Sequence, residues 1–223
     1  MVALAVGRLN GRLLGWLLFV AVFSALNYGA RFLLTDNEDE PEVAYQYSTS
    51  VATIVQYAFV LGILYLIVRH RHELLALRRP RSWAAAAGIS VTIIVGMLVL
   101  SAALAPFVDP EEEQGLIPSY WDSSRIVQFA LFAAVVTLVA PIVEELMFRG
   151  AGYSLLEPFG RWKAIVVVGV AFGLIHGLVE GFAVITAFGV GLTYLRSRTG
   201  SVYPCIILHS FFNGAALAFG LTT

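Results

Sequence analysis

Long apolar stretches separated by short polar ones run along the whole chain. Several reach the roughly 20 residues that a helix needs to cross a bilayer, and none alternates with the two-residue period of a membrane β-strand. Because only helices or a closed barrel satisfy the backbone in lipid, the pattern predicts an all-α, polytopic membrane helix bundle. We expect about seven transmembrane helices, at residues 11–34, 49–69, 84–107, 126–148, 163–180, 182–197 and 202–221.

The composition agrees with this pattern. Of the 223 residues, 59% are hydrophobic and 13% are charged, whereas soluble domains are about 45–50% apolar and about 25% charged. We therefore expect a multi-pass protein of the cell membrane, with the lipid bilayer as a partner and no nucleic acid. Residues 1–223 are expected to form a single integral membrane domain, because no soluble segment or internal repeat interrupts the pattern.

Positive and negative charges alternate from one loop to the next. Arg8 and Arg12 flank the start of the first span, and residues 69–81 contain five arginines. Further basic residues lie at 161–163 and 196–198, and acidic segments lie at 35–42 and 109–114. Because cytoplasmic loops carry the excess of Lys and Arg, we expect the N-terminus in the cytoplasm and the C-terminus outside.

The charged side chains at membrane depth lie after residue 125. Glu144, Glu145 and Arg149 follow an uncharged run from Val127 to Val143, and the apolar pattern resumes after them. Unpaired, three such charges would cost on the order of 5–10 kcal/mol. Glu145 and Arg149 are four residues apart on one helix face, so we expect an ion pair. Glu144 points about 100° away and remains to face another group.

Two histidines and an asparagine lie in the later spans. His176 follows Phe172 by one helical turn, and Asn213 follows His209 by one turn. A single membrane histidine is usually a packing residue. Together with Glu144, however, these groups could activate water and stabilise an oxyanion. Two histidines and a glutamate could instead bind zinc with an open coordination position.

The order and spacing of these residues resemble the motifs of the CPBP family of membrane proteases. EELMFR fits EExxxR, FGLIH fits FxxxH and HSFFN fits HxxxN. That family groups the CAAX prenyl endopeptidases of the Ras-converting type with bacterial bacteriocin-processing and self-immunity proteins, also called Abi proteins. The resemblance covers about residues 125–217, which would form a catalytic core, with three accessory membrane helices in residues 1–124. The short chain is more similar to the bacterial branch, where prenylated substrates are not expected.

The resemblance implies an intramembrane endopeptidase whose site opens toward the cytoplasm. Its substrates would be membrane-associated peptides or proteins. Glu144 would be the general base that activates water, with His176 assisting it. His209 and Asn213 would stabilise the oxyanion.

The same resemblance implies a structural role for Glu145 and Arg149. The sequence contains no HExxH motif, so no metal cofactor is favoured. Zinc remains an alternative, and its ligands would be Glu144, His176 and His209.

Two functions other than peptide cleavage remain open. The chain could be a non-catalytic immunity or scaffold protein, or a proton-linked transporter, because intramembrane Glu and His also serve proton relays. An endopeptidase would need Glu144, His176, His209 and Asn213 to converge on one water-filled cavity reached from the cytoplasm. In that case, the Glu144 carboxylate should lie within about 8 Å of both imidazoles.

Overall fold

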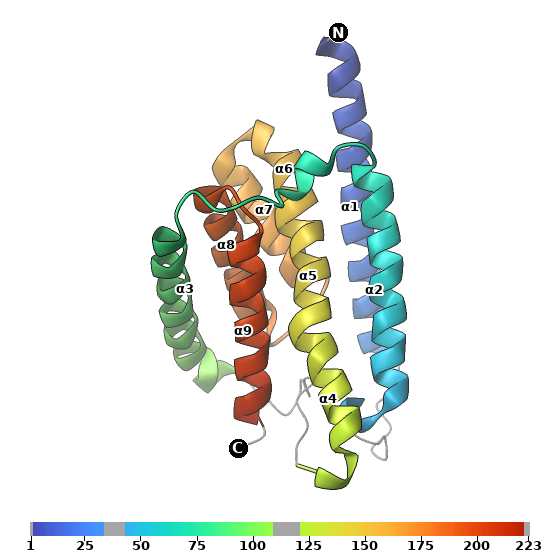
Figure 1. The fold of residues 1–223 in the computed structure, drawn as a ribbon, viewed down its shortest axis with the longest axis vertical. Helices are drawn as coiled ribbons and strands as arrows, with labels where there is room; N and C mark the ends of the chain where they lie inside the picture. The colour runs from blue at the N-terminus through green and yellow to red at the C-terminus, as the bar shows by residue number, and fades with distance from the viewer. Residues whose placement is uncertain (1, 34–42, 109–120, 221–223) are drawn as a thin grey trace.

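The computed structural model describes residues 2–33, 43–108 and 121–220, and every regular element in these ranges is helical. The prediction of an all-α polytopic membrane bundle is confirmed. The chain begins at one end of the bundle and its last helix finishes near the opposite end (Figure 1). The acidic segments 35–42 and 109–114 lie outside the described residues, so the charge alternation can be followed only through the basic segments.

Three long helices precede the segment that carries the two glutamates: α1 (Val2–Leu33), α2 (Tyr47–Val68) and α3 (Trp83–Leu104). One continuous helical rod follows, formed by α4 (Ile126–Ala134), α5 (Ala140–Glu145) and α6 (Tyr153–Leu156) with π-helical segments between them. The bundle is completed by α7 (Arg161–Leu174), α8 (Phe182–Thr199) and α9 (Tyr203–Gly220). Short 3₁₀ turns are found at η1 (Val43–Tyr45), η2 (His72–Leu75), η3 (Ala105–Phe107), η4 (Ser123–Arg125) and η7 (Glu157–Phe159).

The helices differ in their ability to cross a membrane alone. Within the described ranges, four are long and apolar enough: Gly11–Leu33, Tyr47–Val68, Trp83–Phe107 and Ser123–Phe159. The stretch Tyr203–Phe219 in α9 is a shorter apolar helix. α7 has 14 residues and is therefore about 21 Å long, less than the roughly 30 Å of a hydrocarbon core. All seven predicted spans correspond to helices, but the shorter ones depend on their neighbours.

The predicted fifth span, residues 163–180, is wrong at its end. α7 stops at Leu174, because Gly177 has φ of +66°, a left-handed conformation that commonly terminates a helix. His176 therefore lies in a turn between α7 and α8 rather than inside a helix. Hydrophobic periodicity does not reveal this ending, because the residues after it remain apolar.

Helix α1 stabilises this turn. Asn27 Nδ2 donates to Ile175 O, and Tyr28 Oη donates to Leu178 O at 2.9 Å. The end of a helix leaves carbonyls without intrahelical donors, and in a membrane protein they need partners from elsewhere in the protein. A Cβ on Gly177 would lie 2.9 Å from Asn27 Cβ, so the turn also fits closely against α1.

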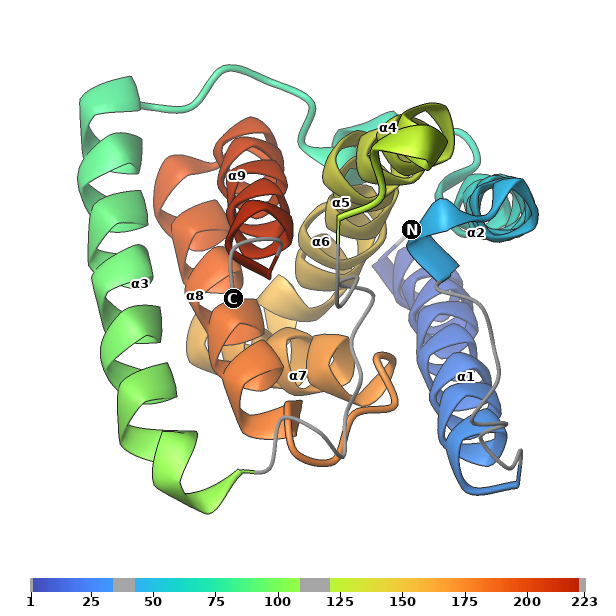
Figure 2. The same ribbon diagram turned by 90° about the horizontal axis from the view of Figure 1, so that it is seen from below.

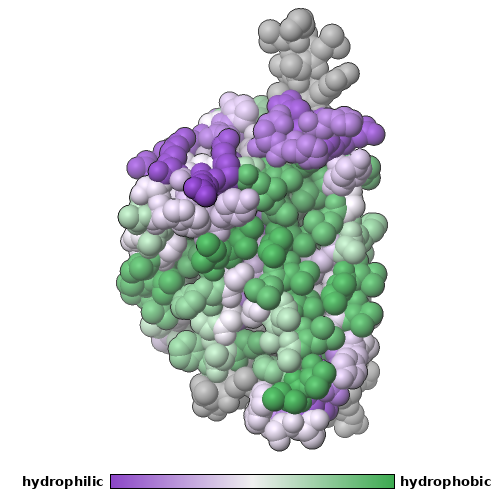
Figure 3. Space-filling model, viewed as in Figure 1, coloured by the Kyte–Doolittle hydropathy of each residue, from purple (hydrophilic) through white to green (hydrophobic). Residues whose placement is uncertain are grey.

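The basic segments gather at one end of the bundle. The loop between α2 and α3, the start of α7 and the end of α8 lie at the same end as the N-terminus (Figure 1). A hydrophilic cap covers this end, and a broad hydrophobic band lies below it (Figure 3). We call it the basic end, and by the positive-inside rule we expect it to face the cytoplasm.

Hydrogen bonds hold the basic loop at residues 69–83 against the bundle. Arg78 Nε donates to Gly200 O at 2.7 Å, and Ser154 Oγ donates to Leu74 O at 2.8 Å. Leu74 is only 6% exposed. The loop therefore covers the basic ends of α6, α8 and α9 as well as carrying positive charge.

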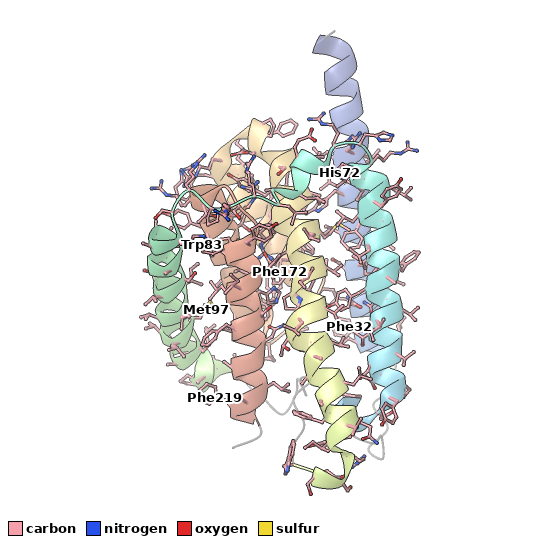
Figure 4. All side chains as sticks on the ribbon, viewed as in Figure 1. Phe32, His72, Trp83, Met97, Phe172 and Phe219 are labelled. Atoms are coloured by element: carbon pink, nitrogen blue, oxygen red, sulfur yellow. The ribbon has the colours of Figure 1, made fainter. Side chains whose placement is uncertain are left out.

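Glycines allow α7 and α8 to pack closely side by side (Figure 2). A Cβ on Gly169 would lie 2.4 Å from the Val190 side chain, and one on Gly173 would lie 2.0 Å from Thr186 Oγ1. Small residues permit such close approach between membrane helices. Phe172, from the same part of α7, is buried near the middle of the bundle (Figure 4), which places the following turn beside the candidate site.

Candidate active site

The two glutamates lie between two π-helical segments of the same helical rod. One segment, Val135–Val139, precedes α5, and the other, Leu146–Gly152, follows it. Such segments are rare and occur frequently at functional sites. Pro141 lacks the N–H that would donate to Val136 O in the π register. Asn213 Nδ2 donates to Val136 O instead, at 3.0 Å.

Glu145 and Arg149 form the ion pair that their spacing predicts. Arg149 Nη1 donates to Glu145 Oε1 at 2.7 Å, and both side chains are fully buried. Arg149 also donates to Gly189 O at 2.9 Å and to Thr193 Oγ1 at 3.3 Å. Its guanidinium carbon lies 4.2 Å from the centre of the Phe172 ring. The pair therefore joins α5 to α7 and α8.

His209 contacts both glutamates. Its Nδ1 lies 2.8 Å from Glu145 Oε1, and its Nε2 lies 3.9 Å from Glu144 Oε2. Glu145 Oε1 already accepts from Arg149, so the carboxylate is an acceptor and His209 Nδ1 carries the hydrogen. Nε2 can then donate only when the ring is doubly protonated. One imidazole thus links two carboxylates that point in different directions.

His176 is held by the turn before it. Its Nδ1 lies 2.6 Å from Phe172 O, and the two rings meet edge to face with centroids 4.6 Å apart. A carbonyl oxygen can only accept, so Nδ1 carries the hydrogen and Nε2 of the neutral ring is an acceptor. His176 can therefore accept a hydrogen bond from water through Nε2.

A pocket of about 270 Å³ brings the four predicted catalytic side chains together. Glu144 comes from α5, His176 from the turn after α7, and His209 and Asn213 from α9. The 3.9 Å between Glu144 and His209 is within the expected 8 Å. The rest of the lining is mostly apolar: Thr53, Tyr57, Phe132, Val136, Ala140, Phe172, Ile185, Phe188, Phe212, Ala216 and Leu217.

The pocket extends away from the basic end. Leu217, a lining residue, lies about two helical turns beyond His209 in that direction along α9. On the other side, Glu145 and Arg149 are fully buried, and Arg149 lies somewhat more than one helical turn nearer the basic end than Glu144. The buried ion pair and the basic loop lie between this pocket and the basic end, and access from the cytoplasm stays a prediction.

Two lining residues were not expected from the sequence. Thr53 and Tyr57 belong to α2, and Tyr57 Oη donates to Glu144 Oε1. Both lie on the inward face of α2 together with Ser50 and Val60, which are buried. A helical repeat of polar residues within an apolar span was the signal available in the sequence.

Zinc would need Glu144, His176 and His209 as ligands. Both imidazoles have Nδ1 held by an acceptor, an orientation that metal-bound histidines commonly adopt. The spacing does not fit, because no three His, Cys, Asp or Glu side chains of the described ranges come close enough to hold one ion. The donor types suit zinc, but their arrangement does not.

Comparison with known proteins finds similarity in the C-terminal part of the chain. Residues 126–215 match the family described as type II CAAX prenyl endopeptidase Rce1-like. Over 84 residues, the chain is 30% identical to the protein named "Putative membrane peptidase YdiL" of Bacillus subtilis (strain 168). That match covers 37% of this chain and 34% of the relative, and no solved structure matches. The predicted resemblance to the CPBP family of membrane proteases is confirmed.

Proposed function

We propose that this multi-pass membrane protein is an intramembrane endopeptidase that hydrolyses peptide bonds with water activated by Glu144. The observation that carries this proposal is that one pocket is lined by Glu144, His176, His209 and Asn213. These side chains come from three separate parts of the fold. Each of them would be costly in lipid if left without a partner. The match to a peptidase family over residues 126–215 supports the same reaction class.

In the proposed first step, Glu144 accepts a proton from water as the water oxygen attacks the peptide carbonyl carbon. His176 orients this water by accepting its second hydrogen at Nε2. Glu144 later gives the proton to the leaving amide nitrogen as the C–N bond breaks. A carboxylate that first acts as base and then as acid is sufficient for hydrolysis.

The oxyanion formed in this step needs donors. Asn213 uses one amide hydrogen to bind Val136 O, and its second hydrogen is available to the substrate because no hydrogen bond among the described residues uses it. His209 would donate from Nε2 in its doubly protonated form, with the negative charge of Glu145 at Nδ1. Preorganised donors of this kind contribute about 2.7–4 kcal/mol each in other hydrolases.

The proposed substrates are membrane-associated peptides or proteins. Aromatic rings of Phe172, Phe188 and Phe212 line the pocket, so an apolar segment would be accepted more readily than a charged one. We do not include prenylation as a requirement, because no feature of the pocket demands it.

This proposal is tested by measuring whether the purified protein, in detergent, cleaves quenched fluorogenic peptides that contain an apolar segment. Glu144→Gln should abolish cleavage, whereas Glu157→Gln, an exposed carboxylate on the same helical rod, should leave the rate unchanged. A scaffold protein would cleave nothing. A proton-linked transporter would instead show uptake that requires a pH gradient and is lost in Glu144→Gln.

A metal-free reaction is part of the proposal. Dialysis against a strong chelator should leave the rate unchanged, and added Zn²⁺ should not raise it. A loss of rate that Zn²⁺ alone restores would refute the metal-free form while leaving endopeptidase activity in place.

A further inference from the structure

One polar side chain of the pocket comes from outside the motif region. Tyr57 lies on α2, and its hydroxyl donates to Glu144 Oε1. It belongs to none of the three motifs, and it lies outside the matched residues 126–215. The phenol lines the same pocket as the predicted catalytic groups, so its contact with Glu144 is made inside the candidate site.

This hydrogen bond makes the two oxygens of the Glu144 carboxylate unequal. Oε1 accepts from Tyr57, whereas Oε2 faces His209 Nε2 at 3.9 Å. Without the phenol, rotation about the last side-chain bond would interchange the two oxygens, because that torsion is broad and roughly two-fold. With Oε1 held, Oε2 is the oxygen presented to the imidazole side of the pocket.

The phenol is itself well placed to hold the carboxylate. Tyr57 is one turn after Thr53 on the inward face of α2, and the buried residues Ser50 and Val60 continue the same face. At the basic end, Arg12 Nη1 donates to Ile67 O at 2.8 Å. Because that bond fixes the end of α2 against α1, the position of the phenol is set by the N-terminal helices.

We propose that Tyr57 is a positioning residue for the general base, a role that rests on the proposed endopeptidase function. Its hydroxyl holds Glu144 so that Oε2 removes the proton from the attacking water. An O–H bond of water breaks and a C–O bond to the substrate forms. The proton on Oε2 then moves to the amide nitrogen as the C–N bond breaks, and Tyr57 keeps its own proton throughout.

A purely structural role predicts a different result. If the hydrogen bond only joined α2 to α5, its loss would lower stability and leave the turnover of the folded enzyme unchanged. If it positions the carboxylate, its loss leaves substrate binding intact and lowers kcat, because a displaced base costs rate in the chemical step. The two roles are separated by kcat, KM and the unfolding temperature measured on the same variant.

Tyr57→Phe removes only the hydroxyl. We expect kcat for the fluorogenic peptides to fall on the order of 10-fold, with KM and the unfolding temperature close to those of the wild type. Tyr65→Phe is the matched control on α2, since Tyr65 is 65% exposed, and it should change nothing. The proposal is overturned if kcat is unchanged, or if the only effect of the substitution is a higher KM.

A measurement without substrate keeps this proposal separate from the proposed function. With ¹³C-labelled glutamate, the infrared difference between the wild type and Glu144→Gln isolates the carboxyl bands of Glu144. These bands should shift in Tyr57→Phe and stay in place in Tyr65→Phe. Unshifted bands reject the role of Tyr57 whether or not the protein cleaves peptides. If the bands shift but the protein cleaves no peptide, only the proposed endopeptidase function is rejected.

Discussion

The N-terminal helices α1–α3 and the C-terminal helices α4–α9 differ in how regular they are. The C-terminal helices carry the motif residues, two π-helical segments and the turn that ends α7. The N-terminal helices are uninterrupted, and their polar side chains donate to atoms of the irregular part. Trp16 Nε1 donates to Met147 O at 3.1 Å, and Asn27 donates to Ile175 O.

Side chains of α1 and α2 thus reach the irregular part of the bundle, whereas the division into a catalytic core and three accessory helices stays a prediction. An irregular helix leaves carbonyls without their usual donors, and lipid cannot supply any. The N-terminal helices provide these donors from within the bundle, and Tyr57 provides one to Glu144 itself. The geometry of the motif residues therefore depends on a part of the chain that contains none of the motifs.

The largest effect is expected within the C-terminal region. Glu145→Gln should lower the free energy of unfolding by about 3–5 kcal/mol, because Arg149 would remain charged and buried without its counter-ion. Glu144→Gln should fold as well as the wild type, since the Glu144 side chain is 14% exposed and no arginine of the described segments pairs with it. Unfolding of the purified proteins in detergent measures both. Equal losses in the two variants would contradict this division of roles.

The next effect is expected at the contact between the two regions. Gly177→Ala should cost about 2–3 kcal/mol, because a side chain at positive φ is strained and its Cβ would press against Asn27. Gly96→Ala in α3 is the control, since nothing lies within 4 Å of the added Cβ. Unfolding in detergent provides the comparison. A similar change in the free energy of unfolding in both variants would mean that contact with α1 does not stabilise the turn.

A smaller effect should follow the loss of one donor from α1. Trp16→Phe keeps an aromatic ring but removes the side-chain hydrogen bond to Met147 O, in the second π-helical segment. We expect a loss of about 1–2 kcal/mol. Trp83→Phe, at a tryptophan that is 51% exposed, should change stability much less. If both substitutions were neutral, the π-helical segment would not need the N-terminal helices.

The smallest effect is expected at the far end of the bundle, where Asp122 N donates to Tyr45 Oη at 3.0 Å. Hydrogen bonds from Ser124, and then from Arg125, lower the pKa of Asp122 to about 2. A lowered pKa stabilises the fold above the ordinary value of about 4, and the contribution disappears as the pH falls toward 2. Asp122→Asn should therefore lower Tm slightly at pH 6, with the difference fading in acid. A difference that persisted at low pH would exclude the carboxylate as its cause.

Local spacing in the sequence was enough to predict much of this arrangement. The pairing of Glu145 with Arg149 follows from helical periodicity, and so does the shared face of His209 and Asn213, because both depend on residues four apart. The apolar runs similarly located the helices, since bilayer thickness fixes their length. These features need no knowledge of how distant segments pack.

Features that depend on distant contacts were not predictable in the same way. The end of α7 is stabilised by Asn27 and Tyr28, which precede it by about 150 residues. Tyr57 is one of nine tyrosines. The polar helical repeat on α2 marks the face that it shares with Ser50 and Thr53, but its contact with Glu144 depends on how α2 packs against α5. The π register before Pro141 leaves Val136 O to accept from Asn213, 77 residues later in the chain. In each case, a tertiary partner decides the local conformation.

The turn between α7 and α8 also constrains how the chain enters the membrane during synthesis. Neither helix is among the described helices that are long and apolar enough to cross alone, and bare carbonyls at the turn would cost several kcal/mol each in lipid. Because α1 leaves the ribosome first, Asn27 and Tyr28 are already in the bilayer when Ile175 and Leu178 arrive. We therefore expect α7 and α8 to insert late, as a preformed hairpin docking onto α1, and a nascent chain lacking α1 to stall at this step.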